Sequence, residues 1–212
     1  MTHISHHIPD DMIRAYASGS LGQAFSLVVA AHVSMCDRCR AQLEAEEAMG
    51  GAVLESVAPA SGDDEAALGA LMAKLDGGER DEPAAVRSGI YPGPVNAALR
   101  GNPPRWKRLG AGIRQDILHA DAEGSVRLLF IPEGSAVPDH GHRGTELTLV
   151  LQGSFSDVTG AFGVGDVEVA DDSLDHVPTA GTEAPCICLA ATEGSLRFRS
   201  LVPSLLQPIF RI

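Results

Sequence analysis

The sequence is poor in aromatic residues, which make up 4% of its 212 positions, and it contains only four cysteines. No apolar run approaches the roughly 18–20 residues that a membrane-spanning helix needs. The longest candidate, 25–31, is followed directly by His32. The segment from Met1 to His7 has no basic stretch followed by an apolar core, so we predict no signal peptide. We therefore expect a cytoplasmic protein with no membrane association, whose thiols are kept reduced.

Basic residues are also scarce: 16 Lys and Arg stand against 28 Asp and Glu, for a net charge of −12. Binding of nucleic acid through its phosphates needs clustered Lys and Arg, so we expect no direct nucleic-acid contact. An acidic surface instead favours a basic protein as the partner. The share of hydrophobic residues, 44%, is typical of a folded protein, and the length fits one large or two small domains.

Residues 1–80 are rich in Ala, Leu, Met and Glu, which favour helices. We predict four helices here, over 12–17, over 23–35, from near Asp37, and from 63–65 onward. Gly50 and Gly51 weaken the far end of the third helix. Apolar residues at helical spacing predict the buried face of the fourth, namely Leu68, Leu71, Met72 and Leu75.

The composition changes after residue 80. Residues 81–104 are interrupted by Pro and Gly and are read as a linker, with Ile90 and Tyr91 expected against a neighbouring domain. From residue 105 the apolar period becomes two, which predicts a sandwich or barrel. Its expected strands are 126–131, 146–152, 166–170, 186–191 and 196–201. The predicted fold class is therefore two domains, all-α (1–80) followed by all-β (105–212).

The helical part contains a metal-binding pattern, H-x3-C-x2-C, formed by His32, Cys36 and Cys39. Residues four apart share a helix face, and Cys39 follows one turn later, so the three can converge on a tetrahedral Zn²⁺ ion. His7 is the favoured fourth ligand, with His6 and His3 as alternatives. Two other interpretations are buried structural thiols and a redox C-x2-C pair, although no strand–helix unit surrounds the pair.

This pattern resembles that of zinc-binding anti-sigma factors, bacterial proteins that trap an alternative, extracytoplasmic-function sigma factor. The resemblance covers residues 1 to about 80 and rests on His7, His32, Cys36 and Cys39. It implies a four-helix zinc domain that lies between two regions of the sigma factor and keeps RNA polymerase from both.

A second pattern lies in the β part, where Gly134 is followed by His140, His142, Glu146 and Gly153. Residues two apart in an extended segment share a face, so His140 and His142 point together, and Glu146 can join them. His176 must arrive from a later strand. Three imidazoles and one carboxylate suit a divalent metal; we expect Zn²⁺, while Fe, Mn and Ni remain open.

This spacing resembles the first cupin motif at every fixed position. The second motif is matched only by Gly165 and His176; the chain has Asp171-Asp172-Ser173 where Pro-x-Gly is usual and Ala180 in place of Asn. Asp166 is interpreted as a turn residue and not as a ligand.

Two more cysteines, Cys186 and Cys188, lie two apart in an apolar strand and so share a face. If that face points inward, they approach the cupin pocket and can serve a redox or sensing role. The favoured interpretation is that they are core thiols.

Together the two halves resemble ChrR-type anti-sigma factors over nearly the whole chain. The resemblance implies one-to-one binding of an extracytoplasmic-function sigma factor by the N-terminal domain, which suffices to inhibit it. It further implies release in response to singlet oxygen or related oxidants, sensed through the cupin. We expect exposed apolar residues, Leu27, Val28 and Leu43, to supply the binding energy.

The competing prediction is enzymatic, because a cupin with three His and one Glu is the usual scaffold of small metal dioxygenases and isomerases. The helices would then be a regulatory appendage. The complete N-terminal ligand set argues against this, so we predict no enzyme. A passive small-ligand sensor differs only in lacking turnover, and the sequence does not separate it from a redox sensor.

Overall fold

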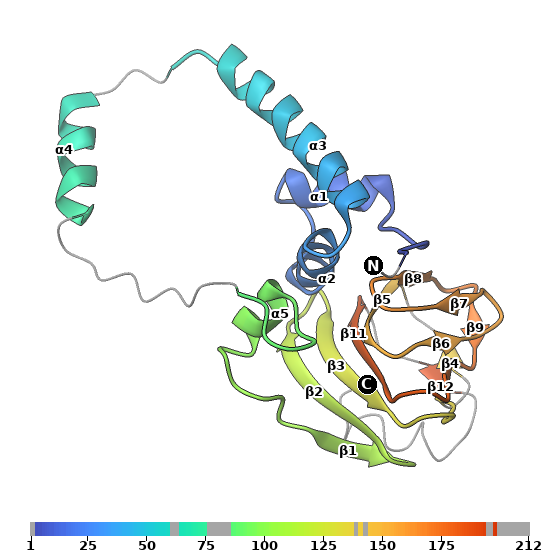
Figure 1. The fold of residues 1–212 in the computed structure, drawn as a ribbon. Helices are drawn as coiled ribbons and strands as arrows, with labels where there is room; N and C mark the ends of the chain where they lie inside the picture. The colour runs from blue at the N-terminus through green and yellow to red at the C-terminus, as the bar shows by residue number, and fades with distance from the viewer. Residues whose placement is uncertain are drawn as a thin grey trace.

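The computed structural model describes residues 3–59, 64–75, 86–137, 140–141, 144–193 and 197–198, of which 140, 141, 197 and 198 are described by backbone only. A helical part precedes a β-domain (Figure 1). The helices are α1 (Asp10–Ala17), α2 (Gln23–Val33), α3 (Asp37–Ser56), α4 (Asp64–Leu75) and α5 (Gly93–Ala98). Among the described helices, none combines the length and apolarity needed to cross a bilayer.

The four predicted helices of the N-terminal part are present. The third continues through Gly50 and Gly51 to Ser56, because two glycines weaken a helix without ending it. Its second half has little to pack against: Met49, Val53 and Leu54 are all more than 60% exposed.

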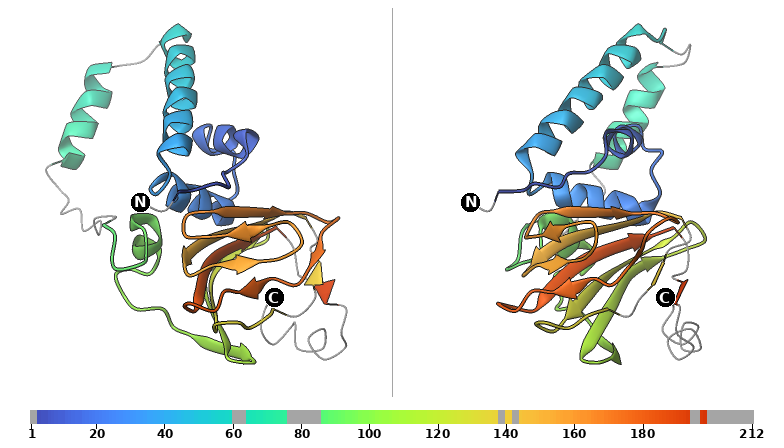
Figure 2. Two further views of the ribbon diagram at one scale, coloured as in Figure 1. Left: turned by 45° about the vertical axis from the view of Figure 1, so that its right-hand side comes forward. Right: turned by 90° about the vertical axis from the view of Figure 1, so that its right-hand side faces the viewer.

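The fourth helix differs from expectation. We expected α4 to bury the row Leu68, Leu71, Met72 and Leu75, and this expectation is wrong: these side chains are 54–58% exposed. The spacing correctly predicts an apolar helix face, but α4 stands apart from the other described elements (Figures 1 and 2). The face therefore has nothing to cover it within the described part of the chain.

The segment read as a linker is ordered in part. Residues 81–85 lie outside the described residues, but α5 begins after Pro92 and packs on α2 with Val95 fully buried. Ile90 and Tyr91 pack against the same core, as predicted. Composition suggests that this stretch cannot order itself, and its order comes from contacts with α2 instead.

The β-domain is built on a six-stranded antiparallel sheet in the order β1-β2-β3-β11-β5-β8. Two three-stranded sheets, β10-β6-β7 and β12-β4-β9, complete it. The strands are β1 (Lys107–Gly110), β2 (Ile113–Ala120), β3 (Ser125–Ile131), β4 (His140–Gly141), β5 (Glu146–Gln152), β6 (Phe155–Ser156), β7 (Ala161–Phe162), β8 (Val167–Ala170), β9 (Asp175–His176), β10 (Thr179–Ala180), β11 (Cys186–Thr192) and β12 (Arg197–Phe198).

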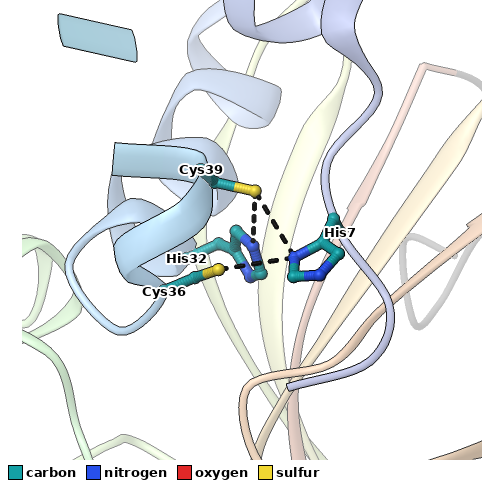
Figure 3. A group of neighbouring side chains, drawn as sticks. All are labelled: His7, His32, Cys36 and Cys39. Atoms are coloured by element: carbon teal, nitrogen blue, oxygen red, sulfur yellow. Dashed lines mark hydrogen bonds between the residues drawn. The ribbon is translucent and has the colours of Figure 1, made fainter. Parts of the chain in front are cut away.

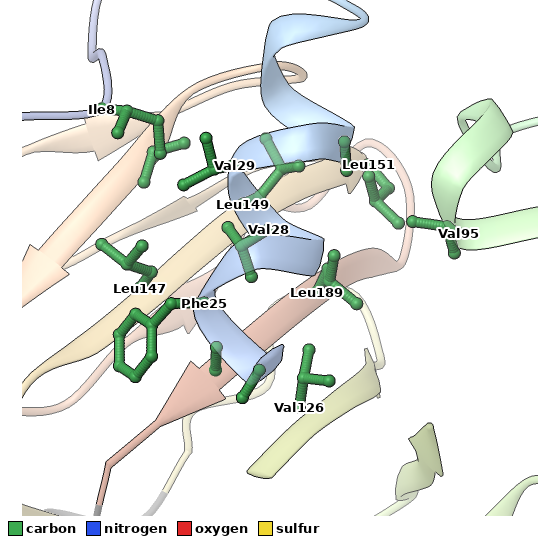
Figure 4. Close-up of a cluster of buried hydrophobic side chains, with 14 of the residues drawn as sticks. Ile8, Phe25, Val28, Val29, Val95, Val126, Leu147, Leu149, Leu151 and Leu189 are labelled. Atoms are coloured by element: carbon green, nitrogen blue, oxygen red, sulfur yellow. The ribbon is translucent and has the colours of Figure 1, made fainter. Parts of the chain in front are cut away.

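The central strands of the large sheet are buried on both faces. All seven residues of β11 and six of the seven residues of β5 are buried, and β11 is apolar at every position except Thr192. On one face, Val150 and the two cysteines of β11 pack with Phe155 and Phe162 inside the β-domain. On the other face, Leu147, Leu149 and Leu189 pack against α2 (Figure 4).

Helix α2 is thus the middle layer between the sheet and the other helices, and a helix in that position is apolar nearly all round. Phe25, Val28 and Val29 are 0–4% exposed and form one core with the sheet (Figure 4). The helical part and the β-domain therefore share a hydrophobic core.

This shared core corrects the predicted partner-binding residues. Val28 is 0% exposed because it faces the sheet, and Leu43 is 9% exposed because α3 packs on α1, with Ile13 in the same core. The expectation that these two are surface residues is wrong. Leu27 is half-buried at the edge of the core.

Candidate metal centres

The structure brings four predicted ligands, His7, His32, Cys36 and Cys39, into one N-terminal cluster (Figure 3). Their donor atoms lie within 4.8 Å of one another. His32 Nε2 is 3.2 Å from Cys39 Sγ, and His7 Nδ1 is 3.4 Å from Cys36 Sγ and 3.6 Å from Cys39 Sγ.

Each ligand comes from a different local structure. His32 is in the last turn of α2, Cys36 is the N-cap of α3, and Cys39 lies in the first turn of α3. The tight α2–α3 turn, closed by the bond from the Cys36 N–H to the His32 carbonyl, brings these three together. His7 arrives from the extended segment before α1.

The choice among the N-terminal histidines follows from geometry. His7 faces the two sulfurs, whereas the ring of His6 packs against Phe162 at 4.5 Å between centroids. His3 is exposed and contacts Ser5 Oγ. The structure thus brings His7, and neither alternative, into the cluster.

Burial sets the protonation of the N-terminal cluster. Burial lowers the pKa of His32 to about 4, against a hydrogen bond with the Gly165 carbonyl, so its imidazole is neutral at pH 7. Burial and the neighbouring Cys36 raise the pKa of the Cys39 thiol to about 11. At neutral pH, a buried thiol with such a pKa loses its proton only when a cation lies beside it. The donor set therefore fits a metal ion.

The β-domain pattern is only partly described. The side chains of His140 and His142 lie outside the described residues, although the backbones of His140 and His176 are paired between β4 and β9. Glu146 is 8% exposed and accepts a hydrogen bond from Thr148 Oγ1 at 3.0 Å. His176 is 2% exposed.

Two acidic residues that were not among the predicted ligands, Asp157 and Glu168, surround His176. Its Nδ1 lies 2.5 Å from Asp157 Oδ2 and 3.5 Å from Glu168 Oε1, and these three residues form a β-domain cluster whose donor atoms lie within 4.8 Å. A metal bound by His176 would use Nε2, because Nδ1 is engaged with a carboxylate. Such carboxylate–histidine–metal arrangements fix the orientation of the ring. Of these two acidic residues, only Glu168 could have been singled out from the sequence, because it is an acidic residue inside the otherwise apolar strand Val167–Ala170.

In the β-domain cluster, each ionisable side chain shifts the pKa of its neighbours. Burial raises the pKa of Glu168. Burial acts to lower the pKa of His176, but hydrogen bonds with Glu168 and Asp157 outweigh it and raise that pKa. Burial also opposes ionisation of Asp157, yet bonds from Glu168, Thr159 and His176 lower its pKa to about 2. Asp157 is therefore the carboxylate that holds the imidazole.

Cys186 and Cys188 are fully buried, with their sulfurs 3.3 Å apart. The hydrogen bond with Cys186 and burial raise the pKa of Cys188 well above its usual value, and the charges of Glu146 and Glu168 add to this. A thiol in these surroundings stays protonated, whereas reactive cysteines are usually thiolates.

Asp166 closes a turn, as predicted, by accepting the Gly163 N–H at 2.9 Å. Its other carboxylate oxygen accepts the N–H groups of Ser5 and His6. Local sequence patterns do not predict this second contact, because its partners are 161 and 160 positions apart.

Comparison with known proteins places these features in context. Residues 97–195 match the model of the ChrR cupin-like domain family. The chain is 50% identical over 212 residues, 99% of each chain, to the anti-sigma-E factor ChrR of Cereibacter sphaeroides. It also superimposes with a TM-score of 0.78 on a crystal structure of Rhodobacter sphaeroides SigE in complex with the anti-sigma ChrR. That match has 49% identity and covers 90% of this chain and 99% of the other.

These similarities confirm the predicted fold, a helical part followed by a cupin β-barrel. They also confirm the prediction of a regulatory protein over that of a metalloenzyme, since the relative is named for regulation. With half of all positions identical over the full length, the chain belongs to the ChrR family of anti-sigma factors.

Proposed function

We propose that this chain is a cytoplasmic anti-sigma factor that binds one extracytoplasmic-function sigma factor, one to one, and releases it on oxidative, singlet-oxygen-like stress. The observation that carries the proposal is the full-length identity to a protein named as an anti-sigma-E factor. The crystal structure of SigE with its ChrR supports a sigma factor as the partner.

We propose that the ion in the N-terminal cluster is Zn²⁺. Bond lengths of about 2.3 Å to sulfur and 2.05 Å to nitrogen place the donors of a tetrahedral site about 3.6 Å apart for S–N pairs. Three of the four S–N separations here, 3.2, 3.4 and 3.6 Å, are close to that value. A closed Cys2His2 set is typical of structural zinc, which would pin the N-terminal segment to the α2–α3 turn.

We also propose a second divalent metal in the cupin, held by His140, His142, Glu146 and His176, with Zn²⁺ favoured over Fe, Mn or Ni. The burial of Glu146 and His176 supports this. Asp157 and Glu168 would orient the imidazole of His176 through its Nδ1 atom, which leaves Nε2 for the metal. Cys186 and Cys188 were candidates for sensing; their burial and the raised pKa of Cys188 favour a packing role.

The sigma-binding surface that we propose is the pair of exposed apolar faces on α3 and α4. It comprises Met49, Val53, Leu54 and Val57 from the end of α3 and Leu68, Leu71, Met72 and Leu75 from α4, each more than half exposed. Contiguous exposed apolar side chains on a folded protein mark interaction sites. Leu27 can contribute at the edge, whereas Val28 and Leu43 would need the core to open.

The test is capture of sigma factors by the full chain, followed by transcription with and without the chain. We expect one sigma factor to be captured and its transcription lost. The double substitution Leu71→Glu/Leu75→Glu should weaken binding on the order of 100-fold or more, since each buried Leu is worth roughly 1.5–3 kcal/mol.

Ala70→Glu/Ala73→Glu is the matched control, because it adds the same charge to the opposite face of α4. It should leave the affinity within about threefold of the unsubstituted chain. If the two double variants bind equally well, α4 is not part of the interface. If the unsubstituted chain captures no sigma factor, the anti-sigma assignment fails.

Zinc binding to the N-terminal cluster should depend steeply on pH. The Cys39 thiol, with a pKa raised to about 11, keeps its proton at pH 7 without metal, so binding must displace that proton. Affinity should therefore fall by at least about tenfold for each pH unit lowered, as expected for release of at least one proton. His32, with a pKa of about 4, begins to compete only near that pH.

Chelator competition at pH 6, 7 and 8 measures this slope. Cys39→Ser should make this slope shallower by about tenfold per pH unit, because the proton of Cys39 is no longer released. An affinity independent of pH would exclude thiolate ligation.

A further inference from the structure

A short segment of the β-domain, residues 163–167, holds the N-terminal segment that carries His7. Asp166 Oδ1 accepts the Ser5 N–H at 2.7 Å and the His6 N–H at 2.9 Å. The Val167 N–H in turn donates to the His6 carbonyl at 3.3 Å. Three hydrogen bonds thus fix the backbone immediately before His7, and Figure 2 shows this N-terminal segment passing beside the β-domain before it enters α1.

The same segment also holds His32. The Gly165 carbonyl lies 2.9 Å from His32 Nδ1. A carbonyl can only accept, so Nδ1 carries the proton and Nε2, 3.2 Å from Cys39 Sγ, presents its lone pair to the cluster. The β-domain therefore sets the tautomer and the ring orientation of one ligand and the backbone position of another.

The contact leaves no room for a side chain at Gly165. Its φ is +93°, and a Cβ there would lie 2.6 Å from Ile4 Cδ1. The Ile4 side chain thus packs directly on the backbone of Gly165 and adds an apolar contact to the three hydrogen bonds.

This segment leads directly into the β-domain cluster. Glu168, two residues after Asp166, contacts His176. Two positions along a strand span about 7 Å. Residues 165–168 thus make three contacts within four consecutive positions. The Gly165 carbonyl contacts His32, the Asp166 carboxylate holds the segment before His7, and the Glu168 carboxylate lies beside His176.

We propose that Asp166 and the Gly165 carbonyl are positioning groups for the N-terminal metal cluster, and that residues 165–168 couple it to the cupin cluster around His176. The inference rests on the proposed zinc site. Asp166 touches no ligand side chain of the cluster; it acts through the backbone of Ser5 and His6. A displacement of this segment at the cupin end withdraws the support of His7 and His32 and speeds the loss of their ion.

The test is the rate at which the full chain gives up Zn²⁺ to a chelator, together with the absorption of the Co²⁺-loaded chain. Asp166→Ala should speed zinc release about 10- to 100-fold, the range typical when the support of a metal ligand is removed. It should also change the Co²⁺ ligand-field bands, since His7 loses its fixed position. Asp166→Asn retains an acceptor oxygen and should restore part of the slow release.

Ser5→Pro probes the contact from the other side without altering the β-domain. It removes the N–H that Asp166 accepts and should speed release several-fold, whereas Ser5→Ala keeps that N–H and should release zinc at the unsubstituted rate. Asp121→Ala is the control within the β-domain, because Asp121 also accepts two turn N–H groups, from Glu123 and Gly124. Fluorescence of Trp106, the single tryptophan, monitors folding of the β-domain in every variant.

Unchanged release and unchanged Co²⁺ bands in both Asp166→Ala and Ser5→Pro would overturn the inference while leaving the zinc site intact. If Asp166→Ala fails to fold, the comparison of the zinc release rates of Ser5→Pro and Ser5→Ala decides the question. If the unsubstituted chain shows no Co²⁺–thiolate absorption, the proposed zinc site fails, and this inference fails with it.

Discussion

Cys36→Ser is expected to remove the zinc of the N-terminal cluster and to abolish sigma binding. Cys36 is a proposed ligand at the N-cap position of α3, where its side chain makes no cap hydrogen bond and Ser is well tolerated. The effect therefore comes from the loss of the ligand, which frees the turn that joins α2 to α3. Structural zinc contributes roughly 10–16 kcal/mol of binding free energy to small domains at neutral pH. Without it, the direction in which α3 leaves the cluster is no longer fixed, and the exposed apolar face at its end is misplaced. His32→Ala should have the same effect.

The measurements are zinc content by metal analysis and sigma affinity by titration of the full chain. Cys186→Ser is the matched control, because it makes the same chemical change in the β-domain core, away from the cluster. Trp106 fluorescence should show a folded β-domain in the Cys36 variant, since the sheet keeps its own core. Retention of tight sigma binding by a zinc-free Cys36→Ser chain would show that the metal does not support the interface.

Replacing the proposed metal ligands of the cupin should have the opposite effect: sigma binding is retained and the response to stress is lost. His176→Ala, Glu146→Gln, His140→Ala or His142→Ala is expected to leave sigma affinity within about twofold and to abolish the induction of sigma-dependent transcription by singlet oxygen. The reason is that Glu146 and His176 lie inside the β-domain, far from α4 and the end of α3 (Figure 1), and that these substitutions leave in place Asp166 and the Gly165 carbonyl, which support the N-terminal cluster.

Reporter transcription with and without a photosensitiser, beside a direct binding titration, checks both halves of this prediction. His119→Ala serves as the control, because His119 is a β-domain histidine that pairs with Asp121 at the surface. If the cupin variants lose sigma binding although they fold, the proposed division of labour between the two domains is wrong.

Local spacing predicts the N-terminal cluster well. His32, Cys36 and Cys39 lie within eight residues, so the short turn between α2 and α3 brings them together, and only His7 had to be chosen among alternatives. The strands over 126–131, 146–152 and 186–191 were predicted equally well, because their apolar runs are long and bounded by turn residues.

The contacts that were missed are the ones between residues far apart in the sequence. Asp166 and Ser5 are separated by 161 positions, and Gly165 and His32 by 133. Asp157 follows β6, Glu168 lies in β8 and His176 lies in β9, and these strands belong to three different sheets, so only the folded domain brings the three side chains together. Periodicity likewise identifies the apolar face of a helix but not its neighbour, which is why Val28 was expected at the surface and the α4 row in the core.

The core shared by α2 and the sheet has a consequence for the order of folding during synthesis. Phe25 and Val28 leave the ribosome early, but Leu147 and Leu189, against which α2 packs, are made more than a hundred residues later. Contacts of such long sequence separation form late, since the intervening chain must first be closed into a loop. Until the β-domain has been synthesised, α2 lacks the sheet that buries it, and His32 lacks the Gly165 carbonyl that orients its ring. A nascent chain of this protein is most open to oxidation or to the wrong metal before that moment.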